Sequence, residues 1–93
     1  MVSEASRHVI LQSFAAVREL ALGAGDLRER LEGACAALLT LESRETPDAL
    51  RDEFHALLAD IMRIDDLSTL SDEAALAIAA RILAFHERLL LHP

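Results

Sequence analysis

The chain has 93 residues, of which 16 are acidic and nine basic, so its formal net charge is −7 with histidine neutral. Hydrophobic residues make up 53% of the sequence, but aromatic residues only 3%. This length allows a single domain, residues 1–93. The apolar content excludes a disordered chain, and one cysteine excludes a disulfide scaffold. Alanine and leucine dominate while β-branched residues are few, so we expect an all-α protein.

The first predicted helix covers residues 4–22, with Ser3 as its expected N-cap. Gly23 and Gly25 follow it, and glycine commonly ends a helix. Apolar residues at spacings of four, three and four are typical of a core-facing helix side, and they predict that the following residues face the core: Ile10, Phe14, Val17 and Ala21.

The second predicted helix covers residues 27–42. Asp26 and Glu29 have the spacing of a capping box at its start. Cys35 lies on its inward side, which indicates an inert core thiol. The expected core-facing residues keep the same helical spacing: Leu27, Leu31, Ala34, Leu38 and Leu41.

The third predicted helix covers residues 47–64. Thr46 is its expected N-cap, and Pro47 occupies the first helical position. Asp65 and Asp66 stand where the helix dipole disfavours negative charge, so we expect a turn over 66–70. The core-facing residues again recur at helical spacing: Leu50, Phe54, Leu57, Ile61 and Ile64.

The fourth predicted helix covers residues 72–91 and is capped by Ser71. Together the four helices predict an antiparallel four-helix bundle. This helix is apolar around most of its circumference, so it is either a central helix covered by the other three or one with a second contact face. We favour the contact face, because small domains bury a limited fraction of their surface alone. The expected interface comprises four leucines and two arginines on their rim: Leu76, Leu83, Leu90, Leu91, Arg81 and Arg88.

Negative charge is concentrated in the third helix and the turn after it. The acidic face predicted there consists of Asp52, Glu53, Asp60, Asp65 and Asp66. Such a face could steer a basic partner, but a solvated surface is the simpler interpretation. No segment has a net positive charge, so the sequence predicts no nucleic-acid partner.

The sequence also predicts what the protein does not do. It has no signal-peptide pattern and no apolar segment of membrane-spanning length, so we expect a cytoplasmic protein without a membrane partner. It has no nucleophile motif, phosphate loop or complete metal pattern. The nearest approach to a metal pattern is Asp52 with His55. We therefore expect no enzyme activity, cofactor or metal.

These observations favour a small acidic helical bundle that acts through protein–protein contacts, as an adaptor, chaperone or anti-activator. Its expected partner is another protein, or itself as a homodimer through the fourth helix. The alternative is a bundle that binds a small apolar ligand or a metal ion, with His55 or His86 as a polar anchor.

Overall fold

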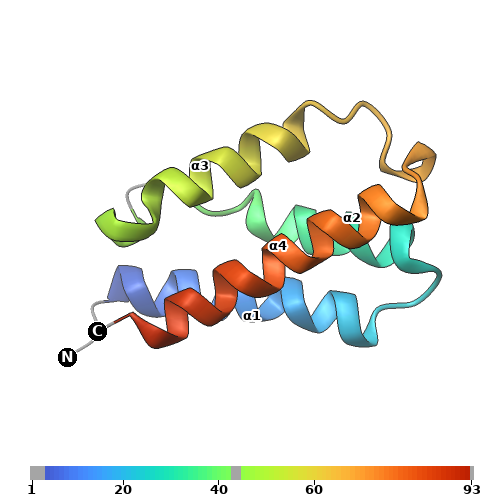
Figure 1. Cartoon of the computed structure of the whole chain (residues 1–93). Helices are drawn as coiled ribbons and strands as arrows, with labels where there is room; N and C mark the ends of the chain where they lie inside the picture. The colour runs from blue at the N-terminus through green and yellow to red at the C-terminus, as the bar shows by residue number, and fades with distance from the viewer. Residues whose placement is uncertain (1–3, 43–44, 93) are drawn as a thin grey trace.

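The computed structural model describes residues 4–42 and 45–92. In chain order they form α1 (Glu4–Leu22), α2 (Leu27–Leu38), α3 (Asp48–Met62), the short 3-10 helix η2 (Leu67–Thr69) and α4 (Asp72–Leu91). No strand occurs within these ranges, so the predicted all-α fold is confirmed. The helices pack as a compact bundle (Figure 1).

Helix α4 packs against all three other α-helices, whereas α1 packs mainly against α2 (Figure 1). α3 and α4 run in opposite directions, since Asp60 pairs with Arg81 and Glu53 pairs with Arg88. Because α4 contacts the three other α-helices, one of its sides lies in the core. Its buried residues are Ala75, Ile78, Ala79, Ile82, Phe85, His86 and Leu89.

Two buried phenylalanines join α3 to α4 in the core. The rings of Phe54 and Phe85 stack with their centroids 5.4 Å apart, and neither side chain is exposed to solvent. The predicted core positions of α2 and α3 are also confirmed, since Leu31, Ala34 and Leu38 are buried, as are most of the predicted residues of α3. A single apolar stripe on each helix explains why the spacing predicted these positions.

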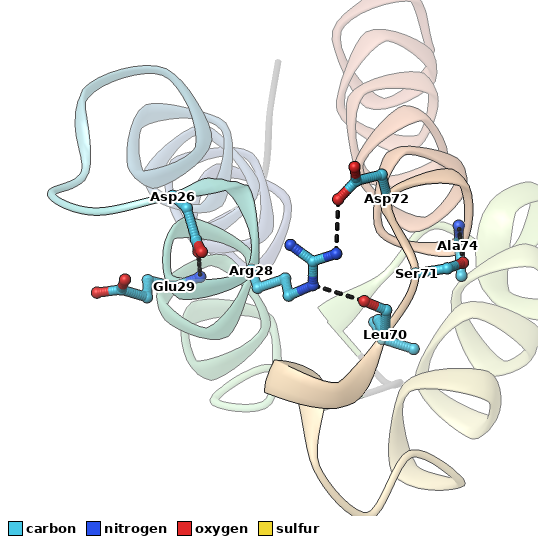
Figure 2. Close-up of polar contacts among 7 residues, drawn as sticks. All are labelled: Asp26, Arg28, Glu29, Leu70, Ser71, Asp72 and Ala74. Atoms are coloured by element: carbon cyan, nitrogen blue, oxygen red, sulfur yellow. Dashed lines mark hydrogen bonds and ion pairs between the residues drawn. The ribbon is translucent and has the colours of Figure 1, made fainter.

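Two helix starts are stabilised by side-chain caps, as predicted. Asp26 accepts a hydrogen bond from the Glu29 amide at 3.0 Å, and the Ser71 hydroxyl accepts one from the Ala74 amide at 3.1 Å (Figure 2). Each cap satisfies a backbone N–H that the first turn of a helix leaves without a partner. The turn before α2 requires Gly25, whose φ of 91° is unfavourable for other residues.

Arg28 joins these two helix starts. Its Nε donates to the Leu70 carbonyl oxygen at 2.5 Å, and a terminal nitrogen lies 2.5 Å from the Asp72 carboxylate (Figure 2). The guanidinium therefore links the first turn of α2 to the segment that leads from η2 into α4. The planar, multi-donor geometry of arginine suits this double contact.

Three predicted helix ends need correction. α2 ends at Leu38 rather than near residue 42, because the Thr40 hydroxyl donates to the Ala37 carbonyl and competes with the helical hydrogen bonds. α3 begins at Asp48 with Pro47 as its N-cap, and it ends at Met62 rather than at residue 64. The predicted Thr46 cap is wrong: its buried hydroxyl finds no hydrogen-bond partner among the described residues. The predicted Ser3 cap lies outside the described residues.

The predicted core side of α1 is only partly correct, because Ile10 and Val17 pack against the core but the fully buried residues lie on a neighbouring stripe. The buried residues of α1 are Val9, Ser13, Ala16 and Leu20. The predicted stripe is displaced to one side, where Ile10 and Val17 are half-buried, Ala21 is exposed and Phe14 is 53% exposed. Both stripes have helical spacing, and the buried one includes a polar residue, Ser13. Its hydroxyl is satisfied there by a hydrogen bond to His86.

Candidate functional site

One side of α4 presents a row of leucines to solvent. Leu76, Leu83 and Leu90 are 59%, 42% and 58% exposed, and Leu91 at the end of the helix is 83% exposed. The first three are seven residues apart, which places them on one side of the helix, two turns from one another. The predicted interface leucines are thus accessible, while a neighbouring side of α4 is in the core.

A second exposed apolar stripe lies beside this row, on α1. Leu11 is 58% exposed, and the ring of Phe14 packs against the ring of His86 on α4, with centroids 5.9 Å apart. Leu83 and Leu90 are three residues before and four after His86, so they lie next to this contact on α4. We call the surface formed by Leu11, Phe14, Leu76, Leu83 and Leu90 the α1–α4 face.

The α1 part of this face is hollowed. A depression of about 500 Å³ is lined by Phe14, Val17, Arg18, Ala21 and Leu22, and most of its surface is carbon. Three of these residues belong to the stripe that the sequence placed in the core. Because the core uses the neighbouring stripe, this apolar surface is available to a partner.

Charges of opposite sign border the α1–α4 face on its two helices. Arg7 and Arg18 are exposed on α1, and Glu73 and Glu87 are exposed on α4. None of the four forms an ion pair with another residue in the described part of the chain. The basic edge and the acidic edge are therefore both available for contacts with another molecule.

The predicted arginine rim lies elsewhere on α4. Arg81 is 2.6 Å from a carboxylate oxygen of Asp60, and Arg88 is 2.6 Å from one of Glu53. These arginines face α3 and not the leucine row, so they neutralise two residues of the predicted acidic face within the chain. Such partly exposed ion pairs contribute about 0–1 kcal/mol each. Their main effect is to align α3 with α4.

The other residues of the predicted acidic face remain accessible. Asp52 is exposed on α3 and has no ion pair within the described ranges. Asp65 and Asp66 lie beyond the end of α3, beside a groove that α3, α2 and η2 form. The structure therefore divides the predicted face into paired carboxylates against α4 and accessible ones elsewhere.

A serine and a histidine are paired beneath the α1–α4 face. Ser13 Oγ lies 2.6 Å from His86 Nδ1, and Ser13 also donates to the Ile10 carbonyl oxygen at 2.9 Å. A proton on Nδ1 satisfies both contacts, because the histidine then donates to the hydroxyl that donates onward. Both side chains are buried. The pair is therefore placed to stabilise the contact between α1 and α4.

Burial of His86 makes folding depend on pH. Burial lowers the pKa of His86 below its ordinary value of 6.5, and the nearby Glu87 carboxylate opposes this effect in part. The unfolded chain therefore binds a proton more readily than the folded chain. Neutral His86 therefore contributes its full stability above pH 6.5, the ordinary pKa of histidine, which applies to the unfolded chain. This contribution is lost as the pH falls from 6.5 through the lower pKa of His86 in the folded chain.

We expect urea unfolding to show this decrease as a smaller free energy of unfolding below pH 6.5 than above it. The His86→Gln variant should lose that part of the pH dependence, whatever its absolute stability. His55→Gln is the matched control, since it makes the same substitution at an exposed histidine. If the free energy of unfolding of His86→Gln and of the unaltered chain varied with pH in the same way, the role assigned to His86 would be contradicted.

The other groups that could carry chemistry are a buried thiol and metal-ligand side chains that do not cluster in the described part of the chain. Cys35 is buried, and this raises the pKa of its thiol to about 11, so the nucleophilic thiolate is scarce at neutral pH. Among the described residues, no three His, Cys, Asp or Glu side chains are close enough to hold a metal ion. No helix in the same part of the chain combines the length and apolar character needed to cross a membrane.

The structure therefore offers an accessible apolar surface with charged edges as its candidate site. Sequence reasoning identified the leucines of α4 but missed Phe14 and Leu11 of α1. Comparison of the chain with protein-family models, curated proteins and solved structures finds no match.

Proposed function

We propose that this protein acts through protein–protein contacts and that a second copy of the chain covers the α1–α4 face. The main observation that supports this proposal is the exposed row of Leu76, Leu83 and Leu90 beside the exposed ring of Phe14. Burying a leucine side chain is favourable by about 1.5–3 kcal/mol. Several such residues on one face provide a driving force for association, and contiguous apolar surfaces of this kind mark interaction sites.

A second copy fits this face because the face is complementary to itself. In a two-fold dimer the same surface patch meets its own copy. An arrangement that places α1 of one copy over α4 of the other brings Arg7 and Arg18 opposite Glu73 and Glu87 of the second copy. The apolar residues then meet at the centre, and residues of opposite charge meet at the edges.

Within this proposal the protein is a cytoplasmic adaptor, chaperone or anti-activator and not an enzyme. Its potential nucleophiles support this interpretation: Ser13 and Cys35 are both in the core, and His86 is bound to Ser13. An enzyme needs such groups in a cleft that substrate can enter. The exposed side chains of α1 and α4 instead include large apolar ones, such as Phe14 and Leu76.

Methyl NMR of the unaltered chain at increasing concentration tests the proposal. We expect the leucine signals of Leu76, Leu83 and Leu90 to shift together as the chain associates. The signal of Leu39, which is 50% exposed outside the face, should stay unchanged and serves as the internal control. Spectra that do not change with concentration, or changes confined to Leu39, would contradict the proposal.

A further inference from the structure

A groove separate from the α1–α4 face lies between α2, the end of α3 and η2. Its volume is about 370 Å³, at the lower end of the range of about 300–1,000 Å³ typical of binding pockets. Cys35 and Ile61 are buried residues of its lining, while Leu39 and Met62 stand beside it, 50% and 73% exposed. The groove thus combines an apolar floor with two accessible apolar side chains.

Three carboxylates border this groove, and no basic residue lines it. They are Glu32 of α2 and Asp65 and Asp66 of the link to η2, all exposed. Glu32 and Asp65 form no ion pair or hydrogen bond with other described residues. Asp66 accepts hydrogen bonds from the hydroxyl and the amide of Ser68, which lower the pKa of its carboxyl group and keep it ionised.

Three of the four carboxylates of α3 are paired with arginines, in contrast to the carboxylates at the groove. Asp60 and Glu53 are neutralised by Arg81 and Arg88, and Asp48 by Arg51. The negative potential at the end of α3 therefore has no matching cation in the groove lining. A ligand that adds positive charge there gains attraction without displacing an internal ion pair.

We propose that this groove, which we call the acidic groove, binds a basic segment of a partner protein that carries an apolar anchor. The anchor side chain lies between Leu39 and Met62, above Cys35 and Ile61. Arginine or lysine residues next to it in the segment pair with Glu32, Asp65 and Asp66. The flexible side chain of Met62 suits such a contact, because methionine adapts its shape to different apolar groups. This proposal is independent of self-association through the α1–α4 face.

Fluorescence anisotropy with two labelled peptides tests the acidic groove. The first is an amphipathic helix with leucines along one side and arginines on the other, and the second has glutamate in place of every arginine. We expect the arginine peptide to bind and the glutamate peptide not to bind. Binding should weaken as salt concentration rises, because exposed charges are screened. Equal binding of the two peptides, or no binding of either, would overturn the proposal.

Two matched variants locate the binding site. Asp65→Asn should raise the Kd of the arginine peptide by about three- to tenfold, as expected for removal of one charge at an interface. Asp52→Asn removes the same charge from an exposed position outside the groove and should leave the Kd unchanged. Equal weakening by both variants would mean attraction to net charge alone, and it would overturn the assignment to the groove.

The Leu83→Glu variant separates this proposal from the proposed function. The arginine peptide should bind it as tightly as it binds the unaltered chain, whether or not that chain self-associates. The contrary result is a peptide that binds Leu83→Glu but does not bind the unaltered chain at protein concentrations where that chain self-associates. In that case a second copy, and not a basic partner segment, would occupy the groove. That result would overturn the proposal of a basic partner segment.

Discussion

Replacing Phe54 with alanine should lower the free energy of unfolding by about 3–5 kcal/mol, as expected for loss of a buried aromatic ring. Phe54 is fully buried, and its ring stacks on that of Phe85 at 5.4 Å. α3 makes its main helix contact with α4, so the variant removes the centre of the contact that holds α3 in place. Small domains have only about 5–15 kcal/mol of stability, so a large part of it should be lost.

Phe14→Ala is the matched control for this prediction, because it makes the same chemical change at an exposed ring. Phe14 is 53% exposed, and its substitution should change the stability of the single chain by less than about 1 kcal/mol. Urea unfolding followed by circular dichroism measures both variants, at concentrations low enough to avoid association. Similar losses for Phe54→Ala and Phe14→Ala would contradict the buried and exposed positions described for these rings.

Replacing Leu83 with glutamate should raise the dissociation constant of self-association by about 100-fold or more, or roughly 3 kcal/mol. Association buries the exposed part of this leucine in both copies, and full burial of one leucine is favourable by about 1.5–3 kcal/mol. Glutamate loses this contribution and adds the cost of placing a charge in an apolar contact. The chain itself should stay folded, because Leu83 is 42% exposed in the single chain.

Met62→Glu provides the control for Leu83→Glu. It introduces the same charge at a side chain that is 73% exposed and lies outside the α1–α4 face. Size-exclusion chromatography with light scattering should show a monomer for Leu83→Glu and unaltered association for Met62→Glu. Equal dissociation of the two variants would show that added negative charge, and not loss of the leucine contact, separates the copies.

The accuracy of the sequence predictions depended on how many apolar stripes a helix carries. α2 and α3 each have one, so Leu31 and Phe54 could be placed in the core from spacing alone. α1 has two apolar stripes, and the stripe that contains Ser13 is the one buried in the core. The partner that makes this serine acceptable, His86, is 73 residues away in the sequence. No local pattern could have shown that contact.

The candidate site was predictable to the same limited extent. α4 has more apolar surface than three neighbouring helices can cover, so the sequence indicated that residues such as Leu83 would be accessible. The roles of Arg81 and Arg88 were not predictable, because they depend on how α3 is aligned with α4. The exposure of Phe14 depends likewise on which stripe of α1 enters the core.

The mass of the unaltered chain in solution is the most direct test of the central proposal, that a second copy covers the α1–α4 face. Sedimentation equilibrium measures this mass over a range of concentrations. The proposal predicts a mass that rises with concentration to twice the 10.2 kDa of the chain. A mass of 10.2 kDa at every concentration, up to the high micromolar range, would contradict it.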